Sequence, residues 1–237
     1  MTDLVLYEHP LSPYAQKCKI SLYEKGVAFQ LKMPAAIGTG QVDSDFLKAN
    51  PRGEVPALID GDFAVFDSTV ILEYIEDRFP SPAMLPHDPK LKAKARMIED
   101  AMDTHYEPIN WGLGELRWFK RAEGERARVI EARAAGQARD FFAWLERQLG
   151  EGEWFCGDTF GWADLSVIPY INGSAGLGIG PRRRRSSAGG KLAPTCGHPY
   201  RRRRKRRPMP SRVWKWSARR CVNVCSSESI AIIGLSG

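Results

Sequence analysis

The sequence predicts a small α/β domain followed by an all-helical domain. Residues 4–79 alternate between strand-like and helix-like segments, a proline-rich stretch follows at 80–89, and the segments after it are helical. The chain has 237 residues, 43% of them hydrophobic, which is enough for two domains with cores of their own. Intrinsic disorder, a collagen-like fold or a small disulfide-stapled fold is therefore not expected for most of the chain.

The first half of the chain predicts the order strand, helix, strand, helix, strand, strand, helix. The uninterrupted apolar run at residues 4–7 is typical of a strand buried on both faces. Ser12-Pro13 starts a helix that ends before Gly26, with a capping serine, a first-turn proline and a terminal glycine as matched signals. Alternation at residues 29–33 predicts the second strand, and residues 43–49 predict a short helix.

A hairpin and a third helix complete this half. Residues 56–59 and 64–66 flank Asp60-Gly61-Asp62, where the glycine accepts the positive φ of a tight turn. Ser68 then caps a helix with a broad apolar face. The face consists of Val70, Ile71, Tyr74, Ile75 and Phe79.

The second half predicts long helices at about 90–121 and 124–149 and a buried helix at 162–171. We therefore expect an α/β domain at 1–82, a linker at 83–89, an incomplete helical domain at 90–181 and a basic, disordered tail at 182–237.

The net charge of +7 is divided unevenly between body and tail. Residues 182–237 hold 16 Lys and Arg against one acid, Glu228, whereas residues 1–181 hold 19 basic and 27 acidic residues. The body has two cysteines and begins without a signal peptide, and no apolar run is long enough to span a bilayer. These features predict a cytoplasmic protein without a membrane partner, and the spacing of its His and Cys residues predicts no metal.

Three separated motifs resemble the glutathione S-transferase family. They are the Ser12-Pro13 helix start, the stretch NPRGEVPALIDGDFAVFDSTVILEYI at residues 50–75, and GDTFGWAD at residues 157–164. The resemblance covers about residues 3–180. It implies a thioredoxin-like N-terminal domain, an all-α C-terminal domain, glutathione as cosubstrate, an apolar electrophilic small molecule as second substrate, and a homodimer.

Ser12 is the candidate catalytic residue. A thiol transferase must hold glutathione as the thiolate, although a free thiol has a pKa of about 8.5. A hydroxyl hydrogen bond and the positive end of a helix dipole both favour the anion, and Ser12 stands where such a hydroxyl is needed. The alternatives are that Ser12 only caps its helix, or that Tyr7 at the end of the first strand takes this role.

The resemblance also implies residues that hold glutathione. Val55-Pro56 corresponds to the family's cis-proline turn, which exposes the Val55 amide and carbonyl to the cysteinyl part of the peptide. Ser68 and the following amides would bind the γ-glutamyl carboxylate, and Asp67 its ammonium group. Gln41 is a candidate anchor for the glycine carboxylate.

Some positions depart from the family pattern. Glu54 stands where a Lys, Gln or Arg often helps to anchor the peptide, and an anion at this position would not attract the glycine carboxylate of glutathione. Gly161 replaces the usual capping Ser or Thr, which leaves Asp164 able to bond the Gly161 amide but removes the reciprocal bond. Trp111, Trp118 and Tyr106 could line an apolar pocket, with core packing as the alternative for each.

The tail allows three hypotheses. Its arginine runs and tryptophans could bind nucleic acid, it could be a solvated segment without a partner, or the reading frame could change near Gly180-Pro181, which we favour. For the whole chain, a glutathione transferase is expected. The alternatives are a glutathione-dependent isomerase, dehalogenase or ether-cleaving enzyme on the same site, or a non-catalytic binding module with a nucleic-acid-binding tail.

Overall fold

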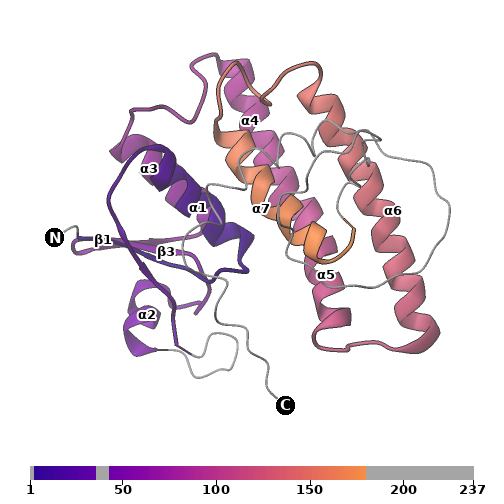
Figure 1. Cartoon of the computed structure of the whole chain (residues 1–237). Coiled ribbons are helices and arrows are strands. Elements are labelled where there is room, and N and C mark those ends of the chain that lie inside the picture. The colour runs from indigo at the N-terminus through magenta and orange to yellow at the C-terminus, as the bar shows by residue number, and fades with distance from the viewer. Residues whose placement is uncertain (1–2, 36–42, 180–237) are drawn as a thin grey trace, which may run out of the picture.

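The computed structural model describes residues 3–35 and 43–179 and consists of a four-stranded sheet with three helices followed by a helical bundle (Figure 1). The sheet is built from β1 (Leu4–Tyr7), β2 (Gln30–Lys32), β3 (Ala57–Asp60) and β4 (Phe63–Phe66), with helices α1 (Pro13–Glu24), α2 (Ser44–Ala49) and α3 (Ser68–Arg78). The bundle is built from α4 (Pro89–Ala101), the π-helical turn η1 (Met102–Tyr106), α5 (Glu107–Arg117), α6 (Gly124–Leu149) and α7 (Trp162–Gly176). The predicted order of elements is confirmed.

The sheet is mixed, with the strand order β2-β1-β3-β4. β1 pairs parallel to β2 and antiparallel to β3, and β3 and β4 form the predicted hairpin. Gly61 in the turn of this hairpin has a φ of 63°, the positive φ that the sequence predicts for a tight turn. Two helices, α1 and α3, pack on one face of the sheet, and α2 covers the other (Figure 1).

The bundle packs directly against the α/β half. Helix α7 contacts both α1 and α4 and lies between them (Figure 1), and its residues are buried along most of its length. One apolar cluster runs without interruption from β1, through α1 and α3, into α4, α6 and α7. The two halves therefore share a continuous core.

Three elements differ from the prediction. The helix expected at 90–121 is divided by η1 and ends at Arg117, and the helix expected at 162–171 continues to Gly176. β2 is short and all three of its residues are exposed, so the alternation of Phe29, Leu31 and Met33 does not mark a buried face. The bounds expected for the two domains and their linker remain a prediction, while Gln41 and residues 182–237 lie outside the described residues.

Candidate functional site

The register of the sheet brings most of the predicted site residues to one side of it, where β1 and β4 end and β3 begins. Tyr7, the last residue of β1, pairs with Ala57, the first of β3, and Ala57 pairs with Phe66, the last of β4. The segments that continue from these positions therefore start side by side. They are the loop that leads to Ser12, the Val55-Pro56 step, and the Asp67-Ser68 step.

Ser12 is the N-cap of α1. Its backbone is extended, with a φ of −81° and a ψ of 112°, and its Oγ accepts a hydrogen bond from the Ala15 N–H at 3.2 Å. An oxygen that accepts this bond keeps its own hydrogen free to donate. Ser12 is half-buried. The cap and a bond to an external thiolate can therefore exist together, and the two roles do not compete.

Tyr7 belongs to the other face of the sheet. Its side chain is buried in the cluster formed with Phe46, Ala49 and Ala57, and its ring lies 5.0 Å from that of Phe46 on α2. Leu6, its neighbour in β1, points into the core with α1 and α3 instead. This arrangement favours the packing role for Tyr7 and leaves Ser12 as the hydroxyl at the start of α1.

Val55 presents free backbone groups at the edge of the sheet. The Val55-Pro56 peptide bond is cis, as the resemblance implies. Within residues 3–35 and 43–179, neither the amide nor the carbonyl of Val55 forms a hydrogen bond. Backbone amides and carbonyls in proteins are nearly always hydrogen-bonded, to protein or to solvent. The Val55 amide and carbonyl are half-exposed at a strand end, so they can bind the backbone of an extended peptide.

Asp67, not Ser68, is the N-cap of α3. Its carboxylate accepts a hydrogen bond from the Thr69 N–H at 3.1 Å, so the predicted serine cap is wrong by one residue. Asp67 has a φ of 74°, a conformation that costs energy for a residue with a side chain and that often occurs at ligand sites. No sequence signal indicates this strain. Ser68 is buried, and its carbonyl accepts from the Cys18 thiol on α1 at 3.5 Å.

Glu54 is neutralised by a neighbour. Its carboxylate accepts hydrogen bonds from the Arg52 guanidinium, one of them from Nε at 2.8 Å, and both side chains are exposed. The Arg52 guanidinium also lies 5.8 Å from the centre of the Phe66 ring at the end of β4. Glu54 thus forms an ion pair with Arg52, and this pairing engages a cation that lies beside the candidate peptide site.

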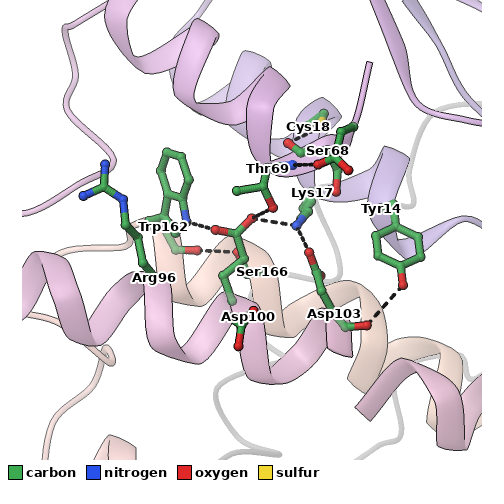
Figure 2. Close-up of polar contacts among 12 residues, drawn as sticks. Tyr14, Lys17, Cys18, Ser68, Thr69, Arg96, Asp100, Asp103, Trp162 and Ser166 are labelled. Carbon is green, nitrogen blue, oxygen red and sulfur yellow. Dashed lines mark hydrogen bonds and ion pairs between the residues drawn. The ribbon is translucent and has the colours of Figure 1, made fainter. Parts of the chain in front are cut away.

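A buried charge network joins the start of α1 to the helical bundle. The fully buried ammonium of Lys17 lies 2.6 Å from Oε1 of Glu99 and 2.5 Å from Oδ2 of Asp103. Figure 2 shows Thr69 and Trp162 aimed at the same carboxylate, and both donate hydrogen bonds to Glu99. Burial alone would lower the pKa of Lys17, but the two carboxylates outweigh it and raise the pKa, so the side chain stays charged.

Sequence reasoning did not identify this network. Lys17 lies about 100° around the helix from Cys18, away from the face formed by Ala15, Cys18 and Leu22, so no local pattern marks it as buried. Tyr170 extends the network by donating to Oδ1 of Asp103 at 2.5 Å. Because it ties α1, α3, α4, η1 and α7 together, it holds the helix that carries Ser12.

The π-helical turn leaves a carbonyl for α1 to bind. A π turn pairs each carbonyl with the N–H five residues later, and for Asp103 that residue is Pro108, which has no N–H. The Tyr14 hydroxyl, in the first turn of α1, donates to this carbonyl at 3.2 Å (Figure 2). Because Pro108 leaves the Asp103 carbonyl without its helical partner, this carbonyl is available to the Tyr14 hydroxyl of the other half of the chain.

Asp164 caps α7 in the way the sequence predicts. Its Oδ2 accepts from the Gly161 N–H at 2.9 Å and its Oδ1 from the Phe155 N–H at 3.2 Å. Burial raises its pKa to about 7, against the lowering effect of these two bonds. A Cβ at Gly161 would lie 2.7 Å from the Met84 carbonyl oxygen, which gives a local reason for glycine where the family usually has a hydroxyl residue.

The three candidate pocket aromatics have different surroundings. Tyr106 is fully buried and hydrogen-bonded to the Ser174 hydroxyl, so it is a core residue. Trp118 is exposed and its ring covers Gly114. Trp111, also exposed, lies one helical turn after Glu107 on α5.

Membrane-spanning helices and clusters of metal ligands are both absent from residues 3–35 and 43–179. No helix there is long and apolar enough for a bilayer span. Within the same residues, His, Cys, Asp and Glu side chains form no group of three that could bind a metal ion.

Comparison with known proteins identifies the family. The model of the glutathione S-transferase N-terminal domain matches residues 6–83, and that of the C-terminal domain matches residues 125–178. Glutathione S-transferase Z1 of Arabidopsis thaliana is 32% identical over 176 residues, which cover 72% of this chain and 77% of the relative. A stringent starvation protein A homolog of Haemophilus ducreyi is 29% identical, covering 75% of this chain and 76% of that protein.

Solved structures agree with this result. A rice glutathione S-transferase in complex with glutathione superposes with a TM-score of 0.64 at 27% identity, covering 74% of this chain and 76% of that one. A beta-etherase from Sphingobium superposes with a TM-score of 0.63 at 25% identity, covering 72% and 83%. The predicted fold class, a thioredoxin-like domain followed by an all-α domain, is confirmed, and the chain belongs to the glutathione S-transferase family.

Proposed function

We propose that the protein binds glutathione at the edge of the sheet and transfers its thiolate to an electrophilic carbon of an apolar small molecule. The observation that carries the proposal is a pair of free groups at the same end of the strands. The Ser12 Oγ accepts its capping bond and so can still donate its hydrogen, and within the described residues the backbone of Val55 forms no hydrogen bond, where the end of β1 pairs with the start of β3. Ser12 donates to the thiolate, and the N-terminal end of α1 adds a favourable field for the negative charge.

The rest of the tripeptide is bound by the neighbouring segments. The Val55 amide and carbonyl pair with the cysteinyl backbone. Asp67 binds the γ-glutamyl ammonium, and Ser68 with the following amides of α3 binds the γ-glutamyl carboxylate. Gln41, outside the described residues, stays a candidate for the glycine carboxylate. The exposed ring of Trp111 provides apolar contact for the second substrate.

Two measurements test this proposal. Isothermal titration should give binding of glutathione, and an aryl halide assay should give conjugation that falls at least about 10-fold in kcat/KM for Ser12→Ala, a loss of about 1.4 kcal/mol. Ser12→Thr, which keeps a hydroxyl and a cap, should retain most of the rate, and Tyr7→Phe should retain it as well. An unchanged rate in Ser12→Ala would show that Ser12 is not the thiolate donor.

The other reaction classes use the same site. An isomerase, a dehalogenase and an ether-cleaving enzyme would all need the thiolate, and a substrate panel with chloride, alkoxide and isomerisable carbonyl groups separates them. Binding of glutathione without turnover on the panel would favour the non-catalytic module. Salt-sensitive nucleic-acid binding that disappears on deletion of residues 182–237 would then support the role of the tail.

We also propose a homodimer in the cytoplasm. Phe63, Val70 and Met97 are large apolar side chains that remain exposed on β4, α3 and α4. The Arg96–Glu73 pair, with Nε to Oε1 at 2.8 Å, joins α4 to α3 in the same region, so these elements present neighbouring surfaces to a second copy. Light scattering during size-exclusion chromatography should give twice the mass of the chain, and Met97→Glu should shift it toward the monomer.

A further inference from the structure

One buried acid is not explained by the core or by the glutathione contacts. Glu107, the first residue of α5, is only 9% exposed, and its Oε2 is buried without a hydrogen-bond partner in the described part of the chain. Buried carboxylate oxygens are rarely left unpaired, and an exception needs an explanation. The residue also follows directly on the π-helical turn, and such turns are frequent at functional sites.

The packing of α1 against the bundle places Glu107 level with the start of α1. Going back along α1, Lys17 contacts Glu99 and Asp103, and Tyr14 contacts the Asp103 carbonyl, so the two helical segments run antiparallel. Glu107 lies one turn beyond Asp103 in the same direction. Its proximity to Tyr14 is independently indicated, because burial and then the charge of Glu107 raise the pKa of the Tyr14 phenol.

The surroundings of Glu107 favour a bound proton. The titratable groups that face it are Tyr14 from α1, Asp103 and Tyr106 from η1, and Tyr170 from α7. Burial and then the Asp103 charge raise the pKa of Glu107 to about 7, while a hydrogen bond from Asn110 lowers it only in part. None of the groups found to act on it within the described residues is basic.

We propose that Glu107 is the proton donor to the leaving group of a substrate that departs as a weakly acidic oxygen, such as an aryl ether. This inference rests on the proposed function. The glutathione thiolate attacks the ether carbon, a C–S bond forms and the C–O bond breaks. The departing oxygen takes the Glu107 proton and leaves as a neutral phenol, and the carboxylate regains the proton that the next glutathione thiol loses on ionisation. The unpaired Oε2 is the atom that carries this proton.

The test compares two leaving groups on the full-length chain. A benzylic aryl ether releases a phenol with a pKa of about 10 and needs a proton, whereas an aryl chloride releases chloride and needs none. Glu107→Gln should lower kcat for the ether at least about 10-fold more than kcat for the chloride. The ether rate of the wild type should fall as pH rises through about 7, and this limb should be absent in the variant.

Two further arms separate proton donation from a structural role. A 4-nitrophenyl ether, whose phenol leaves without a proton, should restore most of the loss in Glu107→Gln. Glu123→Gln, an exposed acid before α6, should change neither reaction. The proposal is overturned if both reactions fall equally in Glu107→Gln, or if the wild type conjugates the chloride but does not cleave the ether. If the wild type reacts with neither substrate and does not bind glutathione, the proposed function fails with it.

Discussion

The Lys17 ammonium lies 2.6 Å from Oε1 of Glu99 across the boundary between the α/β half and the helical bundle, and both side chains are buried. Asp103 binds the same ammonium at 2.5 Å. Three charges are therefore removed from water where α1 packs against α4 and η1. The candidate catalytic serine stands at the start of this same helix α1. Such a group costs desolvation energy and forms only because each member is paired.

Loss of the central cation should be strongly destabilising. Lys17→Met leaves the carboxylates of Glu99 and Asp103 buried without their cation, and we expect the free energy of unfolding to fall by about 3–5 kcal/mol. Urea denaturation measures it. The matched control is Lys48→Met, which breaks the exposed ion pair with Asp45 and should cost less than about 1 kcal/mol. Equal losses in the two variants would mean that the buried network is not a stabilising contact.

The glycine before α7 should not accept a side chain. A Cβ at Gly161 would meet the Met84 carbonyl oxygen at 2.7 Å, so Gly161→Ala should cost about 1–3 kcal/mol, and Gly161→Ser should not gain from its potential cap. Gly112→Ala is the control, because space is open there and alanine favours a helix by up to about 1 kcal/mol. Urea midpoints compare the three variants, and a stable Gly161→Ala would contradict the contact.

Glu107 should make stability depend on pH. Its pKa is about 7 in the folded chain, against 4.5 for an ordinary glutamic acid, so between these values the folded state binds more protons than the unfolded state. The free energy of unfolding should thus decrease as pH rises from 4.5 to 7, by at most about 1.4 kcal/mol per pH unit from this residue. Glu107→Gln should flatten that part of the curve and be more stable than the wild type at pH 8.

Asp164 remains in both proteins and contributes a slope of the same sign, because burial also raises its pKa to about 7. The informative quantity is therefore the difference between wild type and Glu107→Gln, measured by chemical denaturation at several pH values. Identical curves for the two proteins would show that Glu107 titrates at its ordinary pKa.

Release of Arg52 should tighten glutathione binding. Glutathione carries net negative charge, and Glu54 both repels it and occupies the Arg52 guanidinium. Glu54→Gln should lower the Kd about 2- to 5-fold, with the effect reduced in high salt, as calorimetry can measure. The control is Glu73→Gln, which breaks the Arg96 pair between α3 and α4 and should leave the Kd unchanged. A weaker Kd in Glu54→Gln would mean that Glu54 itself contacts the ligand.

Local signals were sufficient for the elements and for the outline of the site. The Ser12-Pro13 start, the Asp60-Gly61-Asp62 turn and the Asp164 cap each depend on contacts within a few residues, so their patterns can be interpreted without the fold. Among the predicted caps and turns, the error was the cap of α3. Asp67 and Ser68 are both good caps, and the left-handed conformation that selects Asp67 has no sequence signature.

The order of elements, the family motifs and the serine at the start of the first helix can all be found in the sequence alone. The side of the sheet to which Tyr7 belongs is visible only in the folded chain, because the direction of this side chain depends on strand register and on the packing of Phe46. The same is true of the burial of Lys17 between two carboxylates, and of the position of Glu107 one turn beyond Asp103, whose carbonyl Tyr14 contacts. The last two relations join residues more than 80 positions apart, and they follow from how helices pack rather than from any local pattern.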